Sequence, residues 1–270
     1  MKFSYLFLLL AFSQFSFSQT NTLVRGPYLQ ITGANSTYIC WKTDVLCDSK
    51  VLYGTNQTNL SSMSYISNSD TLHSNFLSGL LPNTKYYYTV NQSTTQLCGD
   101  TFYFYTAPLI GANQKVRFLA LGDCGSGFAQ QFNVKSAINF YRQSNYINGV
   151  LLLGDNAYLN GTQQEYQSGF FDPYKTNFIF NFSCIYAAPG NHDYANDYNL
   201  SLNHQVPYYE IFKTPQNAEL GGIPSNHKEF YSYNYANAHF ISLDSYGIES
   251  GMYHLWDSLG PQYQWLEQDL

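Results

Sequence analysis

The chain has 270 residues, which exceeds the roughly 100–200 residues of a typical single domain and predicts about two domains. Its formal net charge at pH 7 is −6, and this charge excludes nucleic acid as a partner because the phosphates would be repelled. Charged residues make up only 11% of the chain, against roughly 25% in ordinary globular proteins, and the many Asn, Ser, Thr, Gln and Tyr residues instead favour a secreted or periplasmic protein.

Residues 1–18 predict a signal peptide. A basic residue is followed by an apolar run over residues 3–12, and Ser16-Phe17-Ser18 has the small-x-small spacing of a signal peptidase site. A transmembrane anchor needs about 20 apolar residues, and Ser13 interrupts this run. We therefore expect cleavage near Ser18, export from the cytoplasm and no stable membrane anchor.

The five cysteines are an odd number, so at least one thiol is left without a cysteine partner. Cys40, Cys47 and Cys98 lie in the first third of the chain, where one pair could form a disulfide after export. Cys124 and Cys184 lie in or next to candidate site segments. No CxxC spacing or Cys/His cluster suggests zinc, so we interpret the cysteines as structural or incidental.

Residues 23–108 predict a β-sandwich like that of fibronectin type III domains. Short β-rich runs alternate with polar turns, and no helical period is present. Tyr86 follows a Pro-Asn-Thr turn, as in the tyrosine corner of immunoglobulin-like sandwiches, and Trp41 is the expected core aromatic. Residues 107–113 are the expected linker to the second domain. The clearest of the β-rich runs are residues 37–42, 50–53 and 86–90.

Residues 115–270 predict an α/β domain in which three apolar strands each end at a polar side chain. Asp123, Asp155 and Asn191 follow these strands. Consecutive strands of this kind are joined by crossovers and run parallel, so we expect the three side chains to converge beyond the strand ends. The strands are residues 116–121, 149–153 and 184–187. A helix is expected over residues 129–142, with Phe132, Ala137, Ile138 and Tyr141 on one side.

Each of these polar turns has an ordinary structural interpretation when taken alone. A Gly-Asp pair after a strand is a common turn, Asn191 could cap a helix and His192 could be a packed histidine. The three turns nevertheless recur at intervals of 32 and 36 residues, and all carry oxygen ligands. Oxygen donors combined with imidazole favour a transition-metal hydrolytic centre over a calcium site. A carboxylate such as that of Asp155 can bridge two cations about 3.5–4 Å apart, and the phenol of Tyr158 is a plausible ligand for ferric iron.

These motifs resemble a known family. The sequences GDCG at residues 122–125, GDNAY at 154–158 and GNHD at 190–193 are similar to the first three blocks of the calcineurin-like metallophosphoesterases, and the tyrosine of GDNAY resembles the mark of their purple acid phosphatase branch. Residues 26–30, with the sandwich, resemble the N-terminal domain of that branch, and residues 230–245 resemble its next strand pair. The resemblance implies a fibronectin-III-like domain followed by an α/β metallophosphoesterase β-sandwich flanked by helices.

The resemblance also implies a dinuclear metal centre. By position, Asp123 and Tyr158 would bind Fe(III), Asp155 would bridge, and Asn191 would give its carbonyl oxygen to a divalent Fe(II), Zn or Mn. His192 and Asp193 would be catalytic. His192 would hydrogen-bond the phosphate or protonate the leaving alkoxide.

Asp193 is expected to orient His192, although purple acid phosphatases more often have Glu at this position. The implied activity is that of a secreted acid phosphatase that hydrolyses small phosphate monoesters by attack of a metal-bound hydroxide. The oligomeric state is not predicted.

The sequence departs from the family pattern after residue 255. The family has two further histidine blocks, and residues 256–270 resemble only the start of the helix before them. We therefore expect a chain truncated before three histidine ligands. A phosphodiesterase or nucleotidase of the same superfamily is the alternative activity, and a non-catalytic extracellular binding protein with a degraded phosphatase fold is the alternative class. A structural or surface role is expected for the other histidines, which are His73, His204, His227, His239 and His254.

Overall fold

The computed structural model of the chain describes residues 22–99, 102–175 and 179–270. The predicted signal peptide, residues 1–18, lies outside the described residues. Within these ranges, no helix combines the length and the apolar character that crossing a bilayer requires.

The N-terminal part is formed by strands alone, as predicted. Strand β2 is the longest, and it pairs antiparallel with β1, β3 and β4. Trp41 on β2 is 1% exposed, which confirms it as a core residue. The backbone N–H of Leu81 donates to the hydroxyl of Tyr86 at 3.0 Å, which confirms the tyrosine corner. The strands are β1 Leu23–Gln30, β2 Ser36–Gly54, β3 Ser62–Ser78, β4 Lys85–Gln92, β5 Thr95–Cys98 and β6 Tyr103–Tyr105.

The C-terminal part begins with three parallel strands. Strand β7 (Phe118–Leu121) pairs with β8 (Gly149–Leu153), which pairs with β9 (Cys184–Ala188). The predicted parallel strands are therefore confirmed, within a residue or two at their ends. Strand β7 is less buried than expected, with Ala120 exposed, because it stands at the end of the strand order.

Helix α1 (Ala129–Arg142) forms where the sequence predicts it, but it buries a different face. Phe132 is 46% and Tyr141 is 52% exposed, whereas Gln131 and Ile138 are buried. The side chain of Gln131 accepts from Gly127 N–H at 2.6 Å and donates to the Gly169 carbonyl at 2.7 Å. Of the four residues predicted on the apolar side, only Ile138 is buried, and the polar side chain of Gln131 is buried in their place.

One hydrogen-bonded sheet runs through both predicted domains. Leu29 and Gln30 of β1 pair in parallel with Cys184 and Ile185 of β9. The strand order is β5-β4-β2-β1-β9-β8-β7, with β3 added on β2 and β6 on β4. The buried N-terminal side chains also share a core with residues such as Tyr233. The fibronectin-III assignment and the domain boundaries, 23–108 and 115–270, stay predictions, but the two parts are joined through β1 and β9.

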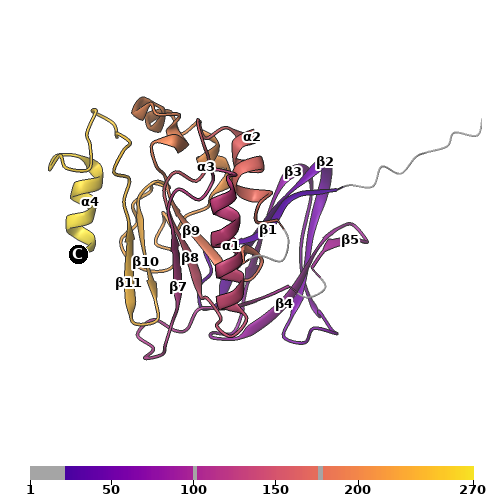
Figure 1. Ribbon diagram of the computed structural model, residues 1–270. Coiled ribbons are helices and arrows are strands. Elements are labelled where there is room, and N and C mark those ends of the chain that lie inside the picture. The colour runs from indigo at the N-terminus through magenta and orange to yellow at the C-terminus, as the bar shows by residue number, and fades with distance from the viewer. Residues whose placement is uncertain (1–21, 100–101, 176–178) are drawn as a thin grey trace, which may run out of the picture.

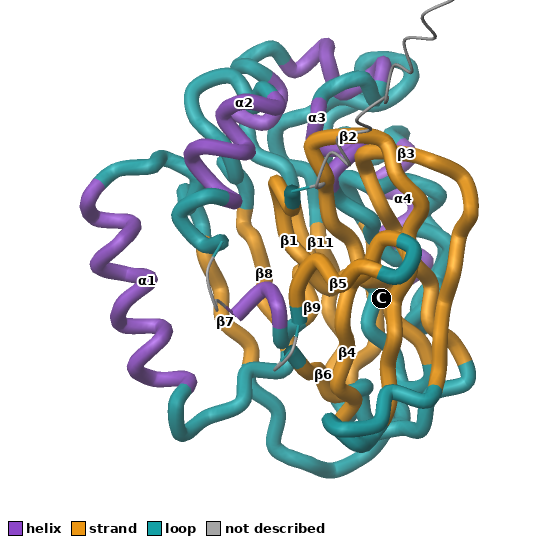
Figure 2. Tube along the Cα trace, turned by 90° about the vertical axis from the view of Figure 1, so that its right-hand side faces the viewer, coloured by secondary structure: helices purple, strands orange, loops and turns teal. Residues whose placement is uncertain are grey.

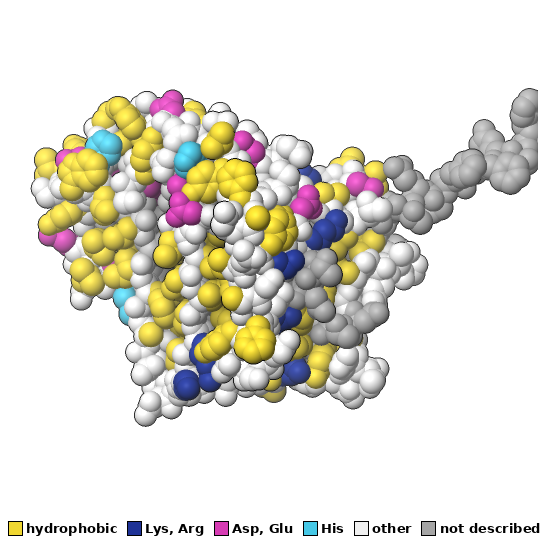
Figure 3. Space-filling view, in the orientation of Figure 1, with side chains coloured by type: hydrophobic (Ala, Val, Ile, Leu, Met, Phe, Trp, Pro, Cys, Tyr) yellow, Lys and Arg dark blue, Asp and Glu magenta, His cyan; other side chains and the backbone are white. Residues whose placement is uncertain are grey.

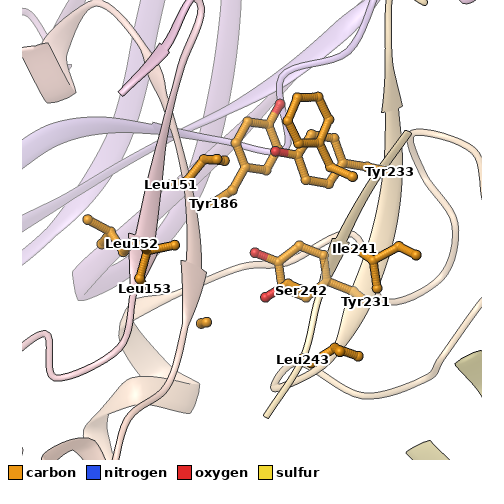
Figure 4. Close-up of a pocket in the computed structure, with 11 residues that line it drawn as sticks. Leu151, Leu152, Leu153, Tyr186, Tyr231, Tyr233, Ile241, Ser242 and Leu243 are labelled. Atoms are coloured by element: carbon orange, nitrogen blue, oxygen red, sulfur yellow. The ribbon is translucent and has the colours of Figure 1, made fainter. Parts of the chain in front are cut away.

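A second layer covers the parallel strands. Strands β10 (Tyr231–Tyr235) and β11 (Ala238–Ser242) pair antiparallel, as expected for residues 230–245. The rings of Tyr186 and Tyr233 stack across the two sheets at 4.0 Å, and Figure 4 shows leucines of β8 facing Tyr231 and Ile241 across a cavity of about 210 Å³. In Figure 1, helix α4 (Pro261–Asp269) lies outside this second sheet and α1 lies on the other side of the first. The expected β-sandwich flanked by helices is thus present.

The remaining helices are short, and all but η2, which directly precedes the start of β9, gather at one end of the sheet. Figure 2 shows α2 and α3 together with several loops above the ends of the parallel strands. These elements are α2 Gln163–Glu165, the π-helix η1 Tyr166–Phe171, the 3-10 helices η2 Ile179–Asn181, η3 His192–Tyr194 and η4 Tyr198–Asn203, and α3 Pro207–Ile211.

The cysteines form no disulfide in the part of the chain that the structure describes. Cys40 and Cys47 lie on the same strand, β2, and their sulfurs contact polar side chains instead. Cys40 lies 3.6 Å from the Ser74 hydroxyl, and Cys47 lies 3.6 Å from Nε2 of His73. The pair considered among Cys40, Cys47 and Cys98 is therefore absent, and burial raises the pKa of Cys40 to about 11.

Candidate metal centre

The three loops that follow β7, β8 and β9 meet at one edge of the sheet. Parallel pairing places the ends of these strands side by side, with Leu121 next to Leu152 and Leu153 next to Ala188. Asp123 lies in the first loop, Asp155 in the second and Asn191 in the third, each within three residues of the strand end. The predicted convergence of the loops is confirmed by hydrogen bonds between them.

Asp155 and Tyr158, both in the second loop, tie the three loops together. Oδ1 of Asp155 accepts from the backbone N–H of His192 at 3.0 Å, and its Oδ2 accepts from the hydroxyl of Tyr158 at 3.3 Å. The same hydroxyl donates to Oδ1 of Asp123. One phenol oxygen therefore lies within hydrogen-bonding reach of both carboxylates that the sequence assigned to metal binding.

The backbone conformation of these turns explains why aspartate and glycine occupy them. Asp123 and Asp155 have φ angles of 54° and 53°, in the left-handed region, which Asp tolerates better than most residues. Gly190 is required by close approach, because a Cβ at this position would lie 2.3 Å from Oδ1 of Asp155. Gly190 therefore lets the backbone of the third loop lie against the carboxylate of Asp155, and Gly154 lets the backbones of the second and third loops approach each other.

The donor set fits a hard cation. Burial and the neighbouring carboxylates of Asp123 and Asp155 raise the pKa of the Tyr158 phenol. The phenol proton thus lies between the phenol oxygen and one carboxylate oxygen each of Asp123 and Asp155. These three oxygens would repel one another if the phenol lost its proton. A multivalent cation placed there would relieve that repulsion and stabilise the phenolate. Carboxylate and phenolate oxygens are ligands that ferric iron and other hard ions accept.

Asn191 is oriented by a neighbour. Its Nδ2 donates to Oδ1 of Asn196 at 2.6 Å, which leaves the carbonyl oxygen of Asn191 as the atom that can bind a cation. Asn196 has a φ of 61°. The role of Asn196 was not predicted. The sequence signal for it is an asparagine, which tolerates a left-handed backbone, five residues after Asn191.

His192 is held by a backbone carbonyl. Its Nδ1 donates to the Leu159 oxygen at 2.7 Å, and its ring packs against Tyr158 with 4.4 Å between ring centroids. Because Nδ1 is used in this way, Nε2 is the nitrogen that can contact a substrate. The carbonyl of Leu159 was not foreseen, since a backbone group leaves no mark in the sequence.

The prediction that Asp193 orients His192 is wrong. Asp193 is fully buried, and its Oδ2 accepts from Gly190 N–H at 2.7 Å and from both the backbone and the side chain of Asn156 at 3.2 Å. Its other oxygen accepts from the hydroxyl of Tyr166. Burial raises the pKa of Asp193 to about 6. Asp193 therefore holds the second and third loops together from the buried side of the site. It points away from His192 because successive side chains of the 3-10 helix η3 point in different directions.

The site is open to solvent on its outer side. Asp155, Tyr158, Asn191 and His192 are partly exposed, and Asp123 is exposed. In Figure 3, acidic side chains and a histidine lie next to one another on the upper part of the molecule, with hydrophobic side chains around them. A small anionic molecule can therefore reach this edge of the sheet from outside.

Comparison with known proteins agrees with this geometry. The calcineurin-like phosphoesterase family matches residues 116–268. A purple acid phosphatase of Glycine max is 28% identical over 206 residues, which cover 74% of this chain and 40% of the relative. Purple acid phosphatase 15 of Arabidopsis thaliana is 25% identical over 220 residues and is covered to 38%. The chain thus spans about 40% of the length of these curated relatives.

Solved structures show the same fold. The purple acid phosphatase PPD1 from yellow lupin (Lupinus luteus) seeds matches with a TM-score of 0.64 and 18% identity, over 89% of this chain and 47% of that one. PhoD matches with a TM-score of 0.58 and 13% identity, over 81% of this chain and 51% of that one.

Proposed function

The chain belongs to the calcineurin-like phosphoesterase family, and we propose that it carries phosphate-binding and metal-binding residues of a phosphomonoesterase of the purple acid phosphatase branch. The observation that carries the proposal is the single phenol oxygen of Tyr158, shared between Asp123 and Asp155. A tyrosine phenolate at this position is a suitable ligand for ferric iron, whereas calcium sites are built from carboxylate, carbonyl and water oxygens.

The proposal assigns each ligand to a metal position. Asp123 and Tyr158 would hold Fe(III), Asp155 would lie between the two ions, and the carbonyl oxygen of Asn191 would reach a divalent Fe(II), Zn or Mn. When bound, the two ions supply Lewis acidity and lower the pKa of water to near neutrality. The match to plant purple acid phosphatases supports this assignment.

The residues of the chain then perform the binding and proton transfer. His192 is anchored through Nδ1, so its Nε2 can donate to a phosphate oxygen or to the oxygen of the leaving alcohol. Asn196 keeps the amide of Asn191 in one orientation. Asp193 holds the loops in register from below and does not touch the substrate.

The overall charge of the chain makes a bound cation necessary for this substrate. A protein of net charge −6 repels a phosphate monoester, and the exposed Asp123 adds to that repulsion. Cations at the loop edge would reverse the local potential where the substrate binds. Export is part of the proposal and rests on residues 1–18, with the apolar run and the Ser16-Phe17-Ser18 spacing as its support.

The test compares two substrates on protein loaded with iron and zinc. We expect hydrolysis of p-nitrophenyl phosphate to exceed that of bis(p-nitrophenyl) phosphate, and Asn191→Ala to abolish it. Asn133→Ala on the exposed side of α1 is the matched control and should leave the activity unchanged. Preference for the diester would support the phosphodiesterase alternative, and bound metal without hydrolysis of either compound would support a binding protein.

A further inference from the structure

A second group of metal-ligand side chains lies away from the loops described above. His204 ends the 3-10 helix η4, and His227 and Glu229 lie just before β10. Nδ1 of His227 lies 2.8 Å and Nε2 of His204 lies 3.4 Å from the same oxygen, Oε1 of Glu229. All three ligand atoms lie within 4.8 Å of one another. The sequence suggested separate structural or surface roles for the two histidines, and the structure instead brings them together.

Glu229 is the buried member of the group. It is 4% exposed, and its second oxygen, Oε2, is buried without a hydrogen-bond partner. Burial alone would raise the pKa of Glu229, but the hydrogen bonds with His204 and His227 outweigh it and lower the pKa to about 2. A carboxylate that is ionised, buried and only half satisfied is costly unless a positive charge compensates it.

We propose that His204, His227 and Glu229 bind a divalent transition-metal ion of the zinc type. Tetrahedral Zn²⁺ with ligand distances of about 2.0–2.1 Å places neighbouring ligand atoms roughly 3.3 Å apart, and the two distances to Glu229 are 2.8 and 3.4 Å. Two imidazoles and one carboxylate form a donor set suited to zinc, whereas calcium and magnesium prefer oxygen donors only.

The rings of the two histidines are already positioned for this role. His204 stacks on Tyr209 with 4.6 Å between centroids, and His227 stacks on Phe230 at 4.4 Å. Stacking on these two buried aromatic rings limits the rotation of the imidazoles. The ion would then replace the protons that hold the cluster together in its absence, with Nδ1 of His227 and Nε2 of His204 as ligand atoms.

The fourth position of the ion would face a pocket. A cavity of about 330 Å³ lies beside His204 and is lined also by Glu210 and Lys228. The amine of Lys228 donates to the Tyr209 carbonyl at 2.5 Å and burial lowers its pKa, although its charge still interacts with His204 and Glu229. A water molecule in the pocket can therefore complete the coordination sphere.

The ion would connect the loop after η3 to the second sheet. His204 comes from the segment between η4 and α3, whereas Glu229 lies two residues before β10. Tyr209, which stacks on His204, also lies 3.1 Å from the hydroxyl of Tyr194, the last residue of η3. The proposed site thus braces the loop that carries Asn191 and His192 without taking part in their chemistry.

The test measures Zn²⁺ bound per protein after dialysis of the metal-free full chain against Zn²⁺ with an excess of Ca²⁺. The wild-type protein is expected to bind one equivalent more than Glu229→Gln or His204→Gln. His239→Gln, a histidine outside the cluster, is the matched control and should keep that equivalent. Asp155→Ala should keep it too, which separates this site from the proposed phosphoesterase centre.

A second measurement does not depend on the buried variant. Zn²⁺ at about 100 times its Kd should raise the Tm of Asp155→Ala by about 5 °C, and this shift should vanish in Asp155→Ala/His204→Gln, where the added change is on a half-exposed ring. Co²⁺ should give the visible absorption of a tetrahedral ion in the first protein and not in the second. Equal zinc stoichiometry in wild type and His204→Gln, or no Tm shift in Asp155→Ala, would overturn the proposal, whatever the phosphatase assay shows.

Discussion

The hydroxyl of Tyr158 donates to the carboxylate of Asp123, which lies 35 residues earlier in the chain and on a different strand end. This contact reinforces two backbone hydrogen bonds between the same loops, from the N–H of Asp123 to the Gly154 carbonyl at 3.2 Å and from the N–H of Tyr158 to the Gly125 carbonyl at 3.3 Å. It also places the phenol oxygen beside two carboxylates, where a multivalent cation could take the place of the phenol proton.

Tyr158→Phe should remove the colour of the iron-loaded protein. Iron bound by a phenolate absorbs visible light through charge transfer, so the wild-type protein with Fe(III) should be purple. Visible absorption spectra of the two proteins at equal iron content provide the measurement. Tyr141→Phe, on the exposed side of α1, should keep the band. A coloured Tyr158→Phe protein would remove Tyr158 from the ligands.

Gly190→Ala should disrupt the metal centre, whereas Gly122→Ala should not. A Cβ at residue 190 would lie 2.3 Å from Oδ1 of Asp155, and a Cβ at residue 122 would meet its nearest neighbour, Leu153, at an ordinary 3.6 Å. Neither glycine has a left-handed φ, so the two substitutions differ mainly in this contact. Metal content after dialysis decides between them, and equal content in both variants would contradict the proposed packing.

Asn196→Ala should lower metal affinity by about 10–100-fold, the usual effect of removing a group that orients a ligand. Asn196→Asp retains the oxygen that accepts from Nδ2 of Asn191 and tolerates the left-handed backbone, so it should restore most of the affinity. Competition with a chromogenic chelator measures both constants. If Ala and Asp behave alike, the hydrogen bond does not position Asn191.

Asp193→Ala should destabilise the fold by about 2–3 kcal/mol, because the buried donors of Gly190 and Asn156 lose their acceptor. Asp193→Asn can keep an oxygen toward those donors and an amide toward the Tyr166 hydroxyl, so it should be much milder in urea unfolding. Asp172→Ala, an exposed carboxylate, serves as the control.

The same pair of variants distinguishes a structural from a catalytic role for Asp193. If the carboxylate acted on His192, Asp193→Asn would lose activity while remaining as stable as wild type. We expect it to retain activity, since the ring of His192 is held by Leu159.

The features that the sequence predicts correctly are those determined by the apolar pattern of the strands and by the positions of the strand ends. Parallel strands put their carboxyl ends on one edge, so the meeting of Asp123, Asp155 and Asn191 follows from three apolar runs and nothing else. Tyr86 and Trp41 were equally predictable, because a turn and a strand determine their surroundings.

The failures share a different cause, which is side-chain direction and contact between distant loops. In a 3-10 helix, successive side chains are about a third of a turn apart, so His192 faces the site while Asp193 points into the core. Gln131 of α1 is buried through hydrogen bonds to two backbone groups, while Phe132 and Tyr141, expected in the core, are exposed. No local sequence pattern predicts the contact between Glu229 and His204, because it results from the packing of two loops that are distant in the sequence.

The insertion of β1 between β2 and β9 has a consequence for any attempt to divide the molecule. Proteolytic cleavage within residues 107–113 would break the covalent link, but Leu29 and Gln30 of β1 would remain paired with Cys184 and Ile185 of β9. The two fragments should therefore stay associated, and expressed apart they should reconstitute on mixing. A C-terminal fragment alone would instead present a bare parallel edge at β9 and tend to self-associate.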